Sequence, residues 1–173
     1  MSNILIIRYI LSFLIYVFVQ ILFAKNLELF GVAFCFVYIH FLLTLPLTIN
    51  PLALLTTGFV LGITIDSFYD TLGMHTFACV LIAYLRPFAV NLISSRNEIL
   101  NLSVKDTGIQ WFSIYTLSLI FVHHFLIFLL QQFNFDMFFY TFIKVIASSI
   151  FTYLAIIVIE YLIYTPVGGN VRK

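Results

Sequence analysis

Long apolar runs alternate along the chain with short polar or proline-containing breaks. Each run is close to the ~20 residues that an α-helix needs to cross the hydrocarbon core of a bilayer. The pattern predicts an all-α integral membrane protein built as a single domain of six membrane-spanning helices. The predicted spans are residues 3–24, 29–49, 52–69, 74–94, 111–131 and 138–164.

Prolines decide how many spans are drawn in the first half of the chain. Merging the second and third runs would leave five spans. However, Pro46 and the pair Asn50-Pro51 interrupt the apolar sequence, and proline disfavours a continuous helix. We therefore expect a break near residue 50. No polar segment is long enough to fold as a separate domain.

Basic residues are distributed unevenly between the two sides of the six-span arrangement. The N-terminus, the connection at 95–110 and the C-terminal tail share one side. The opposite loops hold only Lys25. The positive-inside rule then predicts that both termini and residues 95–110 are cytoplasmic. The five basic residues on that side are Arg8, Arg96, Lys105, Arg172 and Lys173.

Composition narrows the function classes. Of the 173 residues, 63% are hydrophobic and 9% are charged, which excludes an ordinary soluble domain. A net charge of +1 gives no basis for nucleic-acid binding. The sequence contains no phosphate-binding glycine loop, no H-E-x-x-H, no G-x-S-x-G and no Cys/His cluster. We therefore predict no catalytic residues, no cofactor and no metal site.

Two glycines and an acid follow one another at four-residue steps in the third predicted span. Gly58, Gly62 and Asp66 lie roughly above one another on a helix, because four residues advance it by slightly more than one turn. Gly-x-x-x-Gly allows another helix to approach closely. Two interpretations remain open: the stripe packs against a helix of this chain, or it receives the helix of a partner.

Charged residues inside the spans are expected to find partners or to reach the membrane surface. The six-span arrangement places Asp66 level with Lys144, and Arg8 level with Glu160, which suggests two ion pairs. The alternative for both is that the side chains extend independently to the interface. Arg86 lies deep in the fourth span beside a proline, and the sequence does not identify its partner.

The histidines and small polar residues are predicted to mediate helix contacts. His123 and His124 point about 100° apart on a helix, so they do not form a metal site by themselves. His40 and His75 are isolated, and residues 147–152 form a patch of small side chains suited to close packing.

The segment at 58–87 resembles the signature region of the rod shape-determining protein MreD family. In that family a glycine-rich helix runs into an aspartate, and a short Leu-Gly turn leads to a helix that ends near Tyr-Leu and a basic residue. Asp70 departs from the pattern, because a small residue is expected there. The matching residues are Gly58, Gly62, Asp66, Leu72, Gly73, Tyr84, Leu85 and Arg86.

This resemblance implies a non-enzymatic scaffold of the bacterial cell-elongation complex in the inner membrane. Such proteins bind MreC and act with MreB, RodA and the elongation transpeptidase in lateral peptidoglycan synthesis, surrounded by membrane lipid. The family is also similar in fold to the S components of energy-coupling-factor transporters. A substrate-binding subunit of a vitamin transporter is therefore the alternative expectation.

Overall fold

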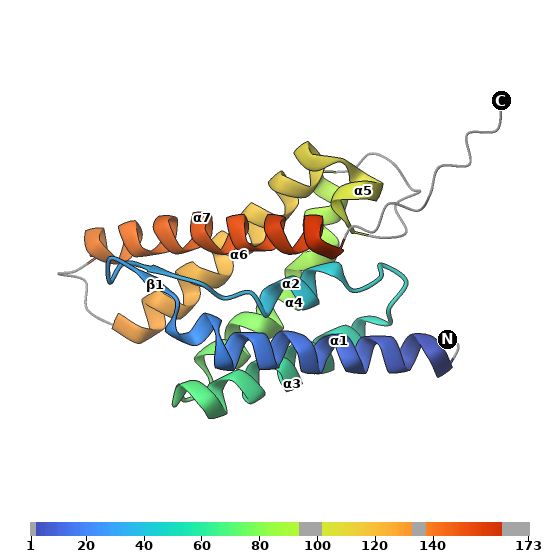
Figure 1. Ribbon diagram of the computed structural model, residues 1–173, viewed down its shortest axis with the longest axis horizontal. Helices are drawn as coiled ribbons and strands as arrows, with labels where there is room; N and C mark the ends of the chain where they lie inside the picture. The colour runs from blue at the N-terminus through green and yellow to red at the C-terminus, as the bar shows by residue number, and fades with distance from the viewer. Residues whose placement is uncertain (1–2, 94–101, 133–137, 164–173) are drawn as a thin grey trace.

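The computed structural model describes residues 3–93, 102–132 and 138–163 (Figure 1). Most of this part of the chain is helical, and five of its helices are long and apolar enough to cross a membrane, so the chain is a helical membrane protein. These helices are α1 (Asn3–Leu22), α3 (Pro51–Tyr69), α4 (Met74–Ile93), α6 (Ile109–Gln132) and α7 (Phe138–Ile163). The shorter elements are η1 (Ala24–Asn26), β1 (Glu28–Leu29), β2 (Ala33–Phe34), α2 (Ile39–Thr44) and α5 (Val104–Thr107).

The second predicted span, residues 29–49, does not form a membrane-spanning helix, and this prediction is wrong. β1 and β2 instead form an antiparallel hairpin with Glu28 opposite Phe34 and Leu29 opposite Ala33. Phe30 and Gly31 make the turn with positive φ angles of 56° and 68°. Beyond the hairpin, Cys35 and Phe36 have no regular secondary structure, and a turn at Val37 and Tyr38 leads into α2. A continuous apolar run is compatible with either a helix or a buried extended segment, which is why the pattern misled.

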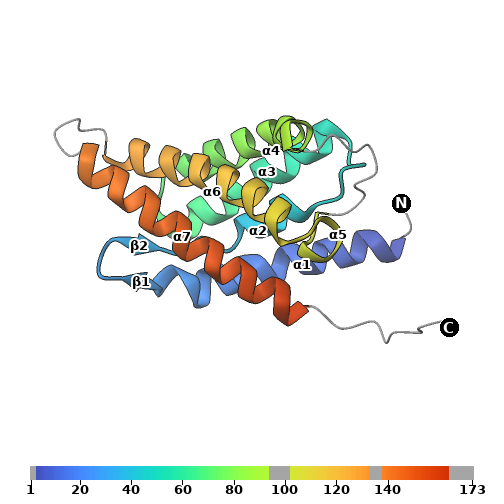
Figure 2. The ribbon, with the colours of Figure 1, turned by 90° about the horizontal axis from the view of Figure 1, so that it is seen from above.

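The elements are arranged between two ends of the molecule (Figures 1 and 2). The start of α1, the end of α7 and α5 lie together at what we call the terminal end. The β1–β2 hairpin and the α3–α4 turn lie at the opposite turn end. The segment from β2 to the start of α3, which we call the returning segment, runs from the turn end to the terminal end. Both described ends of the chain therefore lie at the same end of the molecule, although one predicted helix is missing.

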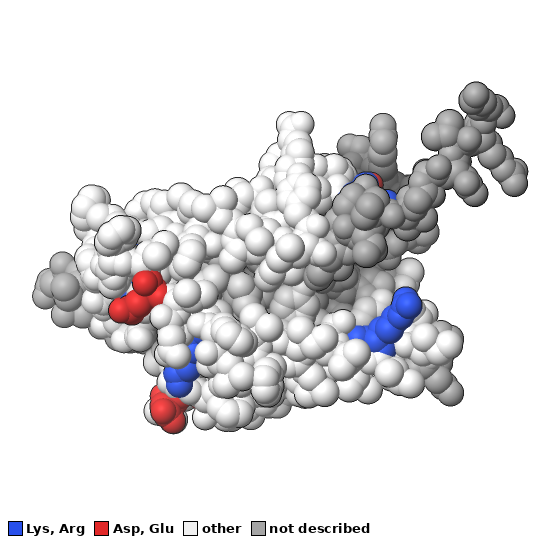
Figure 3. Space-filling model, in the orientation of Figure 1, with Lys and Arg blue, Asp and Glu red and all other residues white. Residues whose placement is uncertain are grey.

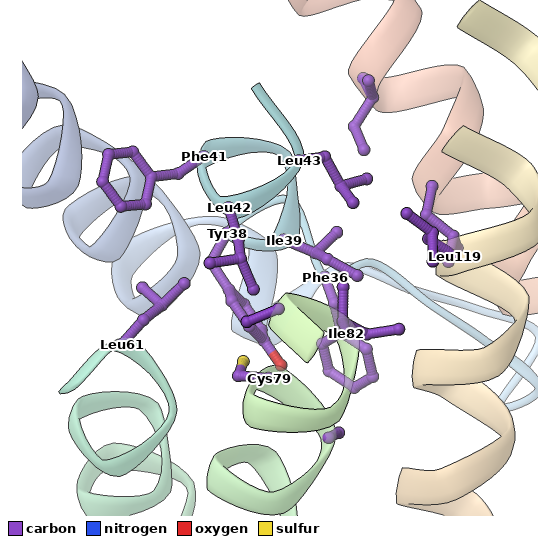
Figure 4. Packing of buried hydrophobic residues seen from close by; sticks show 14 of the residues in the cluster. Phe36, Tyr38, Ile39, Phe41, Leu42, Leu43, Leu61, Cys79, Ile82 and Leu119 are labelled. Carbon is purple, nitrogen blue, oxygen red and sulfur yellow. The ribbon is translucent and has the colours of Figure 1, made fainter. Parts of the chain in front are cut away.

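The returning segment forms the centre of the core. Residues 35–43 are all buried, and Tyr38, Ile39, Leu42 and Leu43 are fully enclosed. Figure 4 shows these side chains between Leu61 of α3, the α4 pair Cys79 and Ile82, and Leu119 of α6. Backbone without helical hydrogen bonds is tolerated at membrane depth only where protein surrounds it. The long helices supply that cover.

Charged side chains on the face seen in Figure 3 gather toward the two ends and leave an uncharged band between them. A band of this kind suits a protein that crosses a bilayer. Lys105 of the predicted cytoplasmic connection lies in α5, at the terminal end. Arg96, Arg172 and Lys173 lie outside the described residues.

Candidate functional site

The glycine stripe brings α3 and α4 into backbone contact. A Cβ atom at Gly62 would lie 2.3 Å from the Cα of Thr76, and one at Gly58 would lie 3.0 Å from the carbonyl oxygen of Cys79. No side chain fits at Gly62 without separating the helices. Of the two interpretations left open by the sequence, packing within the chain describes these glycines, because α4 already covers them.

Asp66 caps the start of α4 from the end of α3. Its Oδ1 accepts the backbone N–H of His75 at 3.0 Å and the hydroxyl of Thr71 at 2.7 Å. Its Oδ2 accepts the backbone N–H of Thr76 at 2.9 Å and the hydroxyl of the same residue at 2.6 Å. The imidazole Nδ1 of His75 lies 3.1 Å from Oδ1. The carboxylate thus satisfies N–H groups in the first turn of α4 and complements the helix dipole.

The turn between the two helices is tight and reaches outward. Asp70 adopts a left-handed conformation with φ 54° and donates its backbone N–H to the carbonyl of Asp66. Gly73 has φ +86°, a conformation that L side chains rarely adopt. Leu72 between them is fully exposed. Asp70, the residue that departs from the family pattern, therefore occupies a position that asparagine, aspartate and glycine tolerate best.

The two predicted ion pairs are not formed in this structure. Asp66 binds α4 as described, and the Nζ of Lys144 lies 4.7 Å and 5.0 Å from the ring centroids of Phe34 and Phe128. Cation–π contacts of this kind stabilise an ammonium group without a carboxylate. Glu160 pairs with His40 at 2.9 Å and accepts the backbone N–H of Val104. Arg8 is exposed and makes no ion pair with the described residues.

Side chains of two helices hold the extended backbone of the returning segment. On α7, Ser148 accepts the N–H of Phe34 at 2.9 Å and Thr152 accepts the N–H of Phe36 at 3.0 Å. On α1, Gln20 donates Nε2 to the carbonyl of Cys35 at 3.0 Å. The predicted small-residue patch at 147–152 thus packs closely, and its neighbour is this backbone. These bonds replace those that a helix or a sheet would supply.

The histidines surround the same segment. The Nε2 of His123 lies 2.8 Å from the hydroxyl of Tyr38, and the Nε2 of His124 lies 3.1 Å from that of Thr152. His123 and His124 are fully buried between helices, where they act as polar contact residues. The described residues contain no group of three or more His, Cys, Asp or Glu side chains that could hold a metal ion.

Arg86 joins α4 to α6 and to the returning segment. Its Nε donates to the hydroxyl of Tyr115 at 3.1 Å, and that hydroxyl donates to the carbonyl of Leu43 at 3.0 Å. Leu43 lies in the last turn of α2, where carbonyl groups lack helical partners. Tyr115 is the partner that the sequence did not identify, because a neutral phenol is not the counter-charge that such reasoning seeks.

A cavity of about 220 Å³ lies at the turn end, where the returning segment passes between α4 and α6. Its walls combine aromatic rings with polar groups. The Nε2 of His75 is buried there without a hydrogen-bond partner among the described residues. Lys25, also in the lining, donates to the carbonyl of Phe68. The principal lining residues are Phe34, Phe36, Tyr69, His75, Phe128 and Gln131.

Sequence reasoning missed Gln20, and it assigned Ser148 and Thr152 to close packing without their bonds to the returning segment. Gln20 is an isolated amide in an apolar helix, and Ser148 and Thr152 are spaced four residues apart on one helix face. Such polar positions in a span indicate that something inside the protein needs hydrogen bonds. Here the groups that require these hydrogen bonds are backbone N–H and C=O groups of the returning segment, not another side chain.

Comparison with known proteins adds no identification. No family model, curated protein or solved structure matches this chain.

Proposed function

We propose that this protein is a non-enzymatic scaffold of the bacterial cell-elongation complex, similar to MreD, that binds MreC in the cytoplasmic membrane. In this proposal both termini are cytoplasmic, and the protein supports lateral peptidoglycan synthesis together with MreB, RodA and the elongation transpeptidase. The proposal rests on the signature-like residues at 58–87 and on the packing, capping and turn contacts that these residues make.

The single observation that carries the proposal is that the signature-like residues form one rigid hairpin. Gly58 and Gly62 allow α3 and α4 to touch, and Asp66 caps the second helix. Gly73 lies in the turn, and Arg86 ties α4 to α6. A motif in which most members maintain one packing unit, while Leu72 and Tyr84 stay exposed, is expected of a protein that presents a fixed surface to partners.

We place the contact with the MreC anchor helix on the outer side of this hairpin. The glycine face is covered by α4, but a groove of about 830 Å³ lies beside it, along the turn half of α3 and α4. Ile63 and Phe77 line its apolar part, and Asp70 lies where it meets the turn. A groove with apolar walls and an acidic end suits a membrane helix that carries a basic residue near its outer end.

Depletion and co-purification test the proposal. Loss of the protein from a rod-shaped bacterium is expected to give round or wide cells, and the tagged protein is expected to co-purify with MreC. Ile63→Trp fills the groove and should reduce MreC recovery. Leu154→Trp, on the exposed face of α7, is the matched control and should not. Normal cell shape together with no MreC recovery would overturn the proposal.

A second candidate function is favoured by the cavity at the turn end. A cavity lined by aromatic rings, an unpartnered imidazole nitrogen and an amide is typical of small-molecule sites. The alternative is therefore a substrate-binding subunit that resembles a transporter S component. Co-purification with an energy-coupling ATPase module and retention of a vitamin would favour this function over the scaffold.

A further inference from the structure

Arg86 is a buried cation with no negative partner among the described residues. Only 1% of the residue is exposed, and the carboxylates of Glu160 and Asp66 lie against His40 and His75 rather than against Arg86. Its Nε is bound to Tyr115, but Nη2 has no hydrogen-bond partner among the described residues. A buried guanidinium with an unused donor is costly, and such groups inside membranes commonly serve a binding role.

A cavity of about 300 Å³ adjoins Arg86 at the terminal end of the bundle. Arg86 is the only charged residue in its lining. Apart from Tyr84, the other lining residues are apolar, and they come from the loop before α3, from α3 itself and from α4. These walls include Leu47, Ile49, Leu54, Leu55, Ala83 and Phe88.

The start of α3 adds a second positive feature to the same cavity. Pro51, the first residue of this 19-residue helix, lines the cavity, and Asn50 caps the helix by accepting the N–H of Leu52. The N-terminal end of a helix carries a partial positive charge and favours anions. The guanidinium and the helix end therefore both favour a negative group here.

The depth of Arg86 in the membrane indicates which class of anionic ligand the cavity suits. Arg86 lies seven residues before Ile93, the end of α4, which corresponds to about 10 Å along a helix. This depth matches the boundary between headgroups and acyl chains. Apolar walls around one cation suit a molecule that joins an anionic group to hydrocarbon.

We propose that this cavity binds the phosphate group of an anionic phospholipid, with Arg86 as its counter-charge. Arginine suits this task because its planar donors match phosphate oxygens. The lipid tails would lie along the apolar walls. This site is independent of the proposed scaffold function, because it lies at the opposite end from the turn and needs no protein partner.

Native mass spectrometry of the full chain in neutral detergent tests the site. We expect phosphatidylglycerol to bind at least tenfold more tightly than zwitterionic phosphatidylcholine. Arg86→Gln should remove this preference. Arg8→Gln, which removes an exposed cation from α1, is the matched control and should retain it. Competition by inorganic phosphate at similar concentration would assign the site to the free anion rather than to the lipid.

A cavity-filling variant covers the case in which Arg86→Gln does not fold. Leu55→Trp leaves the guanidinium in place but fills the space, so it should weaken phosphatidylglycerol binding at least tenfold. Leu52→Trp lies at the same end of α3 on its exposed side and should have little effect. The proposal would be overturned if the Leu55→Trp and Leu52→Trp variants bound phosphatidylglycerol equally. It would also be overturned if Arg86→Gln and Arg8→Gln lost the preference for phosphatidylglycerol to the same extent.

Discussion

The hydroxyl of Thr152 accepts the backbone N–H of Phe36 at 3.0 Å, so a side chain of α7 does what a neighbouring strand does in a sheet. The two residues are 116 positions apart in the sequence. Together with the bonds from Ser148 and Gln20, this contact supplies partners for non-helical backbone inside a helical membrane protein.

Thr152→Val is expected to destabilise the protein, because it keeps the side-chain shape but leaves the N–H of Phe36 unpaired. The cost of a buried unsatisfied donor is about 1–3 kcal/mol in the free energy of unfolding. Reversible unfolding in mixed micelles measures it. Thr56→Val is the control, since that hydroxyl is exposed and bonds only to the carbonyl of Leu52 in its own helix. Equal losses of unfolding free energy in the two variants would contradict the bond between Thr152 and Phe36.

Gly62→Ala is expected to be more harmful than Gly58→Ala. The added methyl at Gly62 would collide with the backbone of Thr76, which cannot move without separating α3 from α4. At Gly58 the nearest atom is 3.0 Å away and a small shift suffices. Overpacking costs about 1–3 kcal/mol, and we expect Gly62→Ala at or above the upper value. Melting temperatures in detergent compare the two, and the reverse order would refute the close contact.

Asp66→Asn is expected to lower the free energy of unfolding by about 1–3 kcal/mol, because an amide cannot accept at both oxygen positions. Where the amide nitrogen replaces Oδ2, the backbone N–H of Thr76 loses its acceptor, and where it replaces Oδ1, that of His75 does. Asp70→Asn provides the control with the same change in charge. Asparagine tolerates the left-handed conformation of that turn position, so its effect should stay within about 0.5 kcal/mol. A larger loss at Asp70 would place the capping role in the turn.

Double-mutant cycles distinguish the observed ion pair from the one expected from sequence. Glu160→Gln combined with His40→Gln should show a coupling energy of about 0.5–3 kcal/mol, because the two groups lie 2.9 Å apart. Glu160→Gln combined with Arg8→Gln should be additive within about 0.5 kcal/mol. Coupling to Arg8 and none to His40 would show that the predicted pair forms after all. Unfolding free energies of the single and double variants provide the measurement.

The long helices could be predicted from the sequence because hydropathy over a wide window determines them. The predicted span at 52–69 corresponds to α3 at Pro51–Tyr69, and that at 74–94 to α4 at Met74–Ile93. Proline and the residue before it correctly indicated the start of α3. Hydropathy and proline act on the residues next to them in the sequence, so the long helices can be recognised from local sequence alone.

The returning segment could not be predicted in the same way. Its apolar residues suit a membrane helix as well as they suit a buried extended chain. The choice depends on Ser148, Thr152 and Gln20, which lie far away in the sequence. A hydropathy window contains no information about such distant partners.

The partners of Asp66 were missed for a different reason. The expected partner was a lysine, because charge suggests counter-charge. The actual partners are backbone N–H groups and hydroxyls only five to ten residues ahead, which the tight turn brings back to the carboxylate. For Arg86 the sequence identified no partner at all, because Tyr115 carries no charge and lies 29 positions away.

The bonds between α7 and the returning segment also constrain the order of biogenesis. The ribosome delivers residues 33–38 long before Ser148 and Thr152 exist, so the nascent segment leaves the translocon without the acceptors for the N–H groups of Phe34 and Phe36. It cannot enter the lipid as a strand, and it has to wait at the interface or in a temporary helical form. The last helix to be synthesised is thus the one that allows an early segment to take its place, and the fold can be completed only after translation has passed residue 152.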